Sequence, residues 1–253
     1  MNRIESTPTT ANEVKRRSPW FALAVGLCCV IGGIILAFSL MRDGQSPAPV
    51  QPNIAQEALA DLEQRKFKPL SEPLTAILAD PAYQSIPTQT HPLLGQQAPD
   101  FTLSDTNDKP IRLSDTLKQG PVVLVFYYGY YCNHCVSQLF ALNKDFEKFR
   151  ELGVTVLAVS ADPTEETRER FKQYGAFSFP VLSDPSNLVA AQYGTFTPSK
   201  KAGEEGQLMH GTFVIDRKGH IVWANRGDSP FTENRTLLVE ISRLERPELL
   251  PKR

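Results

Sequence analysis

The chain has 253 residues with 27 basic and 28 acidic side chains and four cysteines, and 41% of the residues are hydrophobic. This length allows one domain with appendages or two small domains, with a substantial core in either case. The balanced charge gives no general attraction for nucleic acid, four cysteines exclude a disulfide-rich mini-fold, and the composition excludes collagen, coiled coil and wholesale disorder.

An uncharged stretch lies near the N-terminus. Residues 20–41 read WFALAVGLCCVIGGIILAFSLM; a helix of about 22 residues spans the roughly 30 Å hydrocarbon core of a bilayer. The basic cluster at 15–17 precedes it, so the positive-inside rule predicts a cytoplasmic N-terminus at 1–19 and a periplasmic, extracytoplasmic location for everything after Met41. The alternative is a cleaved signal peptide, whose apolar region is shorter, about 7–15 residues, and is followed by a small-x-small site. No convincing site follows, which favours an uncleaved, single-pass transmembrane anchor.

Residues 42–92 are predicted to be a Pro-rich linker and spacer. The segment DGQSPAPVQPN at 43–53 is typical of a semi-rigid, extended linker. Residues 54–66 have a helix-forming composition with apolar residues on one face. Residues 67–95 contain five prolines and no long periodic pattern. They are therefore either a spacer or a strap across the next domain.

From residue 93 the sequence alternates between strand-like and helix-like segments. The pieces at 101–103 and 111–113 flank the turn DTNDKP and predict a hairpin. The continuous apolar runs at 121–128 and 154–160 are typical of buried central strands. The remaining pattern predicts helices over 135–152, 163–174 and 232–244 and a terminal hairpin from 213–216 and 220–224. Such alternation predicts an α/β fold with a central sheet and helices on its faces.

Two helix ends carry recognisable signals. Gly153 is predicted to end the helix over 135–152, because glycine readily adopts the left-handed conformation of a C-cap. Asp162 is predicted to be the N-cap of the next helix, with Pro163 in its first position.

The most informative motif is Cys132-Asn133-His134-Cys135, directly after the strand at 121–128. This context places Cys132 at a helix N-terminus, where free backbone N–H groups and the positive dipole end stabilise a thiolate. Cys135, one turn further, is close enough to close a redox-active disulfide. We predict that Cys132 attacks and Cys135 resolves, while His134 lowers the pKa of Cys132 and makes the couple oxidising.

Other interpretations of these residues stay open. The pair could be a purely structural disulfide, although a bridge over two residues constrains little chain. It could be half of a zinc site, but the other two cysteines, Cys28 and Cys29, lie in the predicted membrane segment. It could bind copper together with a distant histidine. His134 also fits an exposed, solvated histidine.

Residues 93–247 resemble the thioredoxin-like superfamily, specifically its redoxin branch, the alkyl hydroperoxide reductase/thiol-specific antioxidant (AhpC/TSA) proteins. Three separated segments carry the resemblance: APDFTL at 98–103, FPVLSDPSNLVAAQYG at 179–194 and GTFVIDRKGHIVW at 211–223. The resemblance implies that residues 93–253 form a thioredoxin-like domain, with a central mixed sheet flanked by helices.

The chain departs from the peroxiredoxins of this branch at their motif Pro-x-x-x-Thr-x-x-Cys. Tyr128 stands for the proline, Cys132 for the threonine and Cys135 for the peroxide-reacting cysteine. His210 stands where those proteins carry an arginine. Two groups that polarise a peroxide are therefore absent, and antioxidant activity as a thiol peroxidase acting through Cys135 remains only an alternative.

The C-x-H-C form of the motif is similar to that of the periplasmic disulfide oxidases. In the thioredoxin pattern a cis-proline precedes Thr212, and this chain has Gly211 there. A glycine still permits close approach of a substrate backbone. The resemblance therefore implies that Gly211 and Thr212 form part of a substrate-docking edge.

A second resemblance concerns the Sco-like copper chaperones of cytochrome oxidase assembly, which are membrane-anchored thioredoxin-like domains. Their strand end is similar to FYYGYYCNHC here, and the implied copper ligands are Cys132, Cys135 and His210. However, those proteins have three residues between the cysteines where this chain has two, and His210 is displaced by about two positions.

Together these observations predict a membrane-anchored, extracytoplasmic thiol–disulfide oxidoreductase that acts in cell redox homeostasis. Its expected partners are protein thiols and disulfides as substrate, an upstream redox partner, and the membrane through residues 20–41; no nucleic acid is expected. No organic cofactor is implied, and copper enters only under the chaperone alternative.

Overall fold

The structure is a computed structural model that describes residues 53–130, 132–201, 203 and 206–252. These residues belong to one compact unit, 52–253. The main sheet is formed by β1 (Thr102–Asp105), β2 (Pro110–Arg112), β3 (Val122–Phe126), β4 (Thr155–Ser160), β5 (Val181–Ser183), β8 (His210–Ile215) and β9 (Ile221–Gly227). Their order is β2-β1-β5-β4-β3-β8-β9.

The sheet is mixed. Strand β4 pairs in parallel with both β3 and β5, whereas β8 pairs antiparallel with β3 and β9. Strand β1 pairs antiparallel with β2 and β5. Both predicted hairpins and both predicted central strands are therefore confirmed. The observed bounds lie within two residues of the predicted ones, except that β8 begins three residues earlier, at His210, and β9 ends three residues later, at Gly227.

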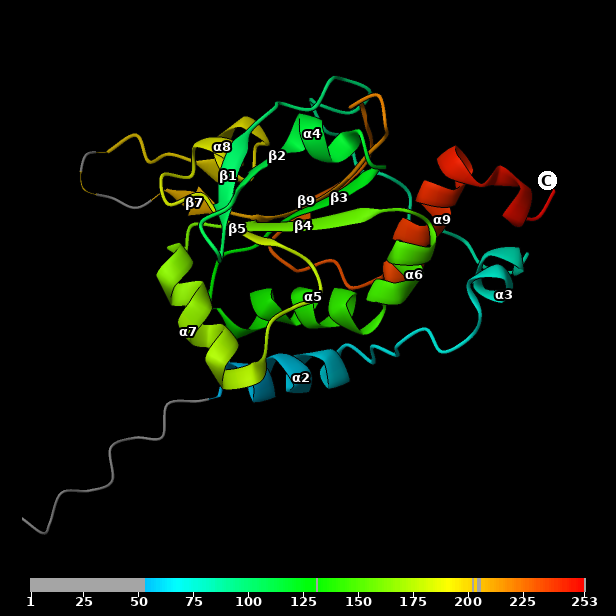
Figure 1. Cartoon of the computed structure of the whole chain (residues 1–253), viewed down its shortest axis with the longest axis horizontal. Coiled ribbons are helices and arrows are strands. Elements are labelled where there is room, and N and C mark those ends of the chain that lie inside the picture. The colour runs from blue at the N-terminus through cyan, green and yellow to red at the C-terminus, as the bar shows by residue number, and fades with distance from the viewer. Residues whose placement is uncertain (1–52, 131, 202, 204–205, 253) are drawn as a thin grey trace, which may run out of the picture. The chain divides into compact units, whose positions relative to one another are not determined.

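Helices cover both faces of the sheet. They are α2 (Ile54–Gln64), α3 (Leu74–Ala79), α4 (Leu113–Leu117), α5 (Asn133–Lys144), α6 (Phe146–Glu151), α7 (Thr164–Tyr174), α8 (Leu188–Gln192) and α9 (Asn234–Glu245), with a 3₁₀ turn at Pro247–Leu249. Figure 1 shows α2, α5 and α7 on one side of the sheet and α4 and α8 on the other. A small two-stranded sheet, β6 (Phe196–Thr197) with β7 (Gln207–Leu208), was not predicted.

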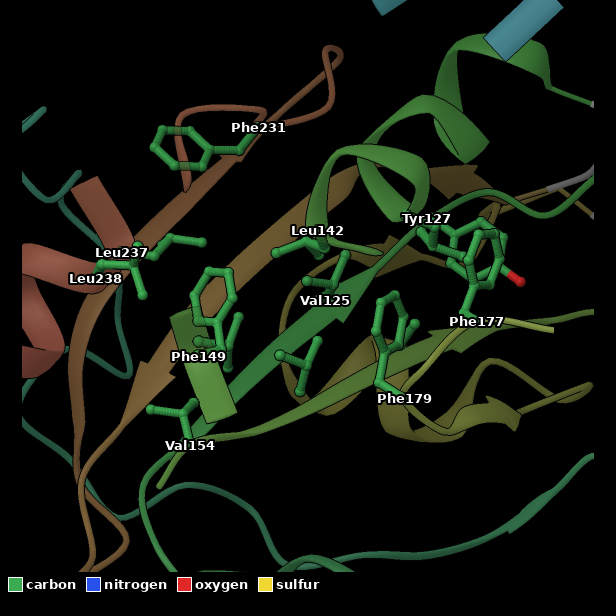
Figure 2. Packing of buried hydrophobic residues seen from close by; sticks show 14 of the residues in the cluster. Val125, Tyr127, Leu142, Phe149, Val154, Phe177, Phe179, Phe231, Leu237 and Leu238 are labelled. Carbon is green, nitrogen blue, oxygen red and sulfur yellow. The ribbon is translucent and has the colours of Figure 1, made fainter. Parts of the chain in front are cut away.

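Strand β3 lies at the centre of the core, and its side chains alternate between the two faces. Val123 and Val125 belong to the apolar cluster that packs against α5, part of which is shown in Figure 2. Leu124 and Phe126 belong to the cluster on the opposite face. All five residues of the strand are buried, because a central strand covered on both faces has no solvent side.

Phe149 of α6 tests how much this core contributes to stability. Its ring is fully buried and lies in the cluster of Figure 2. Phe149→Ala is expected to lower the free energy of unfolding by about 3–5 kcal/mol, because it removes buried apolar surface and leaves a cavity. Leu188→Ala, at a residue 66% exposed, is the matched control and should change it by less than about 0.5 kcal/mol. Denaturant unfolding monitored by circular dichroism measures both; equal effects would contradict the assignment of Phe149 to the core.

The prediction of one helix over 135–152 was wrong, because the chain forms α5 and α6 with a break at Asp145. The backbone of Asp145 is not helical, with φ −106° and ψ 10°. Its buried carboxylate accepts hydrogen bonds from the Leu70 backbone N–H and from Asn234 Nδ2, both at 2.8 Å. These two distant partners hold the break in place. Gly153, with φ 69°, ends α6 as predicted.

The prediction of Asp162 as a helix cap was also wrong. Helix α7 begins at Thr164, and Pro163 occupies the N-cap position. The Asp162 carboxylate instead accepts hydrogen bonds from the Tyr130 backbone N–H at 3.1 Å and from the Ser160 hydroxyl at 3.0 Å. Its oxygens are therefore directed to the loop that leads into the cysteine motif.

The segment between α2 and β1 packs as a strap on the domain, which settles the alternative left open by the sequence. The Trp223 Nε1–H donates to the Ile86 carbonyl at 3.0 Å, and the Gln89 N–H donates to the Ala224 carbonyl at 2.8 Å. The predicted helix over 54–66 is confirmed as α2. None of the helices within the described ranges is long and apolar enough to cross a bilayer; the predicted anchor at 20–41 lies outside these ranges.

Candidate functional site

The cysteine motif lies where β3 passes into α5. Cys132 is the N-cap of α5, in extended conformation, and its carbonyl accepts the Cys135 N–H at 3.0 Å. The two cysteines are joined by a disulfide with a Cα–Cα distance of 5.3 Å. The predicted closure of a disulfide by this pair is thus confirmed. The positive dipole end at the N-terminus of α5 favours a thiolate at Cys132 once the bond is reduced.

The two cysteines differ in accessibility. Cys135 is fully buried in the apolar cluster beneath α5, whereas Cys132 is half-buried at its edge. A substrate approaching from solvent therefore reaches Cys132 first. This arrangement supports an attacking role for Cys132 and a resolving role for Cys135.

Gly129 shapes the loop before the motif. Its φ of 109° lies in a region that L side chains rarely adopt, and a Cβ there would lie 2.5 Å from Asp162 Oδ1. The missing side chain lets the carboxylate reach the Tyr130 N–H. Asp162 thus fixes the backbone that presents Cys132, a role that cap propensity at Asp162 did not indicate.

Burial raises the pKa of Asp162 to about 6, although hydrogen bonds from Ser160 and Tyr130 oppose the shift. Because this pKa is higher in the folded than in the unfolded chain, the contribution to stability is complete below about pH 4 and is lost as the pH rises through about 6. Asp162→Asn cannot ionise, so its stability should gain about 1–3 kcal/mol relative to the wild type between pH 5 and pH 8. Denaturant unfolding at both pH values measures this gain.

The control for this experiment is Asp228→Asn, at an exposed aspartate. Its stability relative to the wild type should stay constant between the two pH values. A constant difference for Asp162→Asn as well would contradict the assignment of a buried, ionisable carboxyl beneath the loop.

His134 is exposed on the first turn of α5, but its ring is anchored. Its Nδ1 lies 2.6 Å from Asp61 Oδ1 of α2. The other oxygen of Asp61 accepts a hydrogen bond from Arg65 Nε, also at 2.6 Å. The effect of His134 on the thiol of Cys132 stays a prediction. Asp61 was missed at the sequence level; the available signal was an acidic residue on the apolar face of the predicted helix.

His210 is buried at the start of β8, with 2% of its surface exposed. Its ring lies against that of Tyr128, with centroids 4.7 Å apart, and Tyr128 donates its hydroxyl to the Leu208 carbonyl at 2.6 Å. Burial lowers the pKa of His210 to about 4, and the charge of Arg65 adds to this effect. His210 is therefore neutral at neutral pH.

The copper alternative needs Cys132, Cys135 and His210 as one set of ligands. Across the described part of the chain, no three histidine, cysteine, aspartate or glutamate side chains are grouped so that they could hold a metal ion. The two sulfurs are bonded to each other. The copper alternative concerns the reduced dithiol and stays a prediction.

Gly211 and Thr212 both lie inside the sheet. Gly211 pairs with Phe126 on one side and with Arg226 on the other. Thr212 is buried, and its hydroxyl accepts a hydrogen bond from Gln138 Nε2 at 2.8 Å. Their role in substrate docking stays a prediction. Within the described ranges no peptide bond is cis.

The site can be compared with those of known proteins. The model of the AhpC/TSA family matches residues 94–224. The chain is 31% identical over 130 residues to the thiol-disulfide oxidoreductase ResA of Bacillus thuringiensis (strain Al Hakam), an alignment that covers 51% of this chain and 67% of that protein. It is also 31% identical over 151 residues to a chloroplastic 2-cysteine peroxiredoxin of Chattonella marina var. antiqua, covering 56% of this chain and 74% of that protein.

Among solved structures, peroxidoxin BcpB from Mycobacterium tuberculosis is similar, with a TM-score of 0.53 and 27% identity. The match covers 60% of this chain and 97% of that one. The predicted mixed α/β, thioredoxin-like fold is thereby confirmed. Both kinds of relative carry out redox chemistry at cysteine, which is consistent with the disulfide at the N-terminus of α5.

Proposed function

Because the chain belongs to the AhpC/TSA family, we propose that it is a redox enzyme of the thiol–disulfide oxidoreductase type, anchored in the membrane with its catalytic domain outside the cytoplasm. The observation that carries the activity is the Cys132–Cys135 disulfide, with a half-buried cysteine at the helix N-cap and a fully buried partner one turn on. An accessible thiolate with a resolving partner is what disulfide exchange requires.

The reaction balances within the cysteine pair and one substrate disulfide. The Cys132 thiolate attacks one sulfur of the substrate disulfide, forms a mixed disulfide and releases the other sulfur as a thiolate. The Cys135 thiolate then attacks the sulfur of Cys132, which releases the second substrate thiolate and forms the Cys132–Cys135 disulfide. Two electrons pass from the enzyme to the substrate. The reverse sequence oxidises a substrate dithiol, and an upstream redox partner restores the starting form in either direction.

Thiol peroxidase activity is the second candidate, because a 2-cysteine peroxiredoxin is among the relatives. In that reaction a peroxide would have to reach Cys135, the residue in the peroxide-reacting position. Cys135 is fully buried and bonded to Cys132. Cys132 also replaces the threonine hydroxyl of the peroxiredoxin motif. Disulfide exchange therefore has the stronger support.

The two activities can be separated on the full chain in detergent micelles. We expect the reduced protein to accelerate the reduction of insulin disulfides and to consume hydrogen peroxide no faster than its Cys135→Ser variant. Insulin precipitation and a peroxide assay measure the two rates in parallel. Rapid, Cys135-dependent consumption of peroxide without reduction of insulin would replace the proposal with peroxidase activity.

A further inference from the structure

Helix α2 lies outside the segment that matches the AhpC/TSA family, 94–224, yet it reaches the cysteine motif. Figure 1 shows it against α5, on the side of that helix away from the sheet. The buried apolar residues of α2 are Ile54, Ala55, Ala58 and Leu62. On the same face, Asp61 is 95% buried, with only 5% of its side chain exposed. A buried carboxylate is costly unless it is paired and hydrogen-bonded, so its partners indicate why it is there.

The partners of Asp61 lie on two helices. Arg65 of α2 donates its Nε–H at 2.6 Å, and His134 Nδ1 of α5 lies 2.6 Å away. Burial raises the pKa of Asp61, but the hydrogen bonds with Arg65 and His134 and the charge of Arg65 oppose it, and the pKa lies below its ordinary value. Asp61 is thus ionised at neutral pH. The negative charge of Asp61 also acts on His210 of β8, where it opposes the lowering of the pKa by burial.

An ionised carboxylate accepts hydrogen bonds and cannot donate them. The short contact with Asp61 therefore requires that His134 Nδ1 carries a proton. An exposed histidine without such a partner would sample several rotamers. Here one rotamer and one proton position are held in the first turn of α5, two residues after Cys132.

We propose that Asp61 is a positioning residue for the Cys132/Cys135 couple: it holds the ring of His134 beside the helix N-terminus and thereby favours the reduced dithiol. This inference rests on the proposed disulfide exchange and assigns the N-terminal helix a part in it. Asp61 acts on the cysteine couple through His134 and is not itself a catalytic residue. The extra helix thus supplies a control on the redox couple that the family-matched segment does not contain.

The equilibrium between the cysteine couple and glutathione tests this proposal on the full chain. Asp61→Asn should shift that equilibrium toward the disulfide by about tenfold, which corresponds to about 30 mV for a two-electron couple. His134→Gln should shift it in the same direction. Because Asp61 acts through His134, adding Asp61→Asn to the His134→Gln background should change the equilibrium by less than about twofold.

Two matched controls separate positioning from structure and from general charge. Glu63→Gln removes a negative charge from an exposed position of α2 and should leave the equilibrium unchanged. Leu62→Ala loosens the docking of α2 and should lower stability without the tenfold shift. If Asp61→Asn does not fold, Asp61→Glu keeps the charge but displaces the carboxylate by one methylene, and a smaller shift in the same direction is expected.

Three results would overturn the inference: no shift for the Asp61 variants, a shift toward the dithiol, or a shift of full size in the His134→Gln background. A different result would contradict the proposed function. If the wild type does not reduce insulin while its equilibrium with glutathione still depends on Asp61 and His134, the positioning role stands and the exchange activity does not.

Discussion

Cys132→Ser is expected to abolish disulfide exchange, lowering the rate by about a thousandfold or more. A serine hydroxyl is not ionised near neutral pH and cannot form a mixed disulfide, so the first step is lost. Cys135→Ser should keep that first step, because Cys132 remains at the helix N-cap, and should accumulate the mixed disulfide with substrate. Insulin reduction gives the rates, and mass spectrometry of the unreduced protein detects the trapped species.

The chain offers a matched control for this pair of substitutions. Cys28→Ser and Cys29→Ser make the same chemical change in the predicted membrane segment and should leave the exchange rate within about twofold. A Cys132→Ser variant that retains activity while Cys135→Ser loses it would contradict the assigned order of attack. That result would instead favour thiol peroxidase activity, in which Cys135 reacts with the peroxide.

Protease added to spheroplasts of a bacterial host that makes the full chain is expected to remove the redox domain almost completely. The expectation follows from the basic cluster at 15–17 and the uncharged stretch 20–41, which together predict an uncleaved anchor with the domain outside. Immunoblotting with an antibody against the domain measures its loss, and the membrane fraction should contain the intact chain before protease is added.

A cytoplasmic marker protein that stays intact provides the control for spheroplast integrity. Protection of the redox domain under the same conditions would place it inside and contradict the proposed topology. A mature N-terminus beyond Met41 would show that residues 20–41 are a cleaved signal peptide. In that case the domain would still be outside, but the proposed anchoring would be wrong.

Features with local causes were predictable from the sequence. The apolar run that forms β3 and the cysteines that follow it specify a buried strand and a helix start by short-range pattern, and Gly153 ends α6 because its own φ favours a C-cap. The sequence also predicted the disulfide between Cys132 and Cys135, since three positions along a helix start bring the two sulfurs within bonding distance.

Features that depend on distant partners were decided only by the tertiary structure. The break at Asp145 is fixed by Leu70 and Asn234, 75 and 89 residues away along the chain. Aspartate is a favoured helix N-cap, but the carboxylate of Asp162 accepts a hydrogen bond from the Tyr130 N–H instead. In both cases the need to pair a buried carboxylate outweighs the local sequence pattern.

The same division holds for the site. From the sequence alone, Cys132, Cys135 and His134 were identified because they lie in one short motif, whereas Asp61 stands 73 positions before His134 in a helix with no motif of its own. Only the packing of α2 on α5 brings its carboxylate to the imidazole. Sequence pattern thus determined the chemistry of the cysteine pair, and the tertiary structure decided which charges surround it, because a contact between helices depends on how their apolar faces dock and not on the spacing of residues within either one.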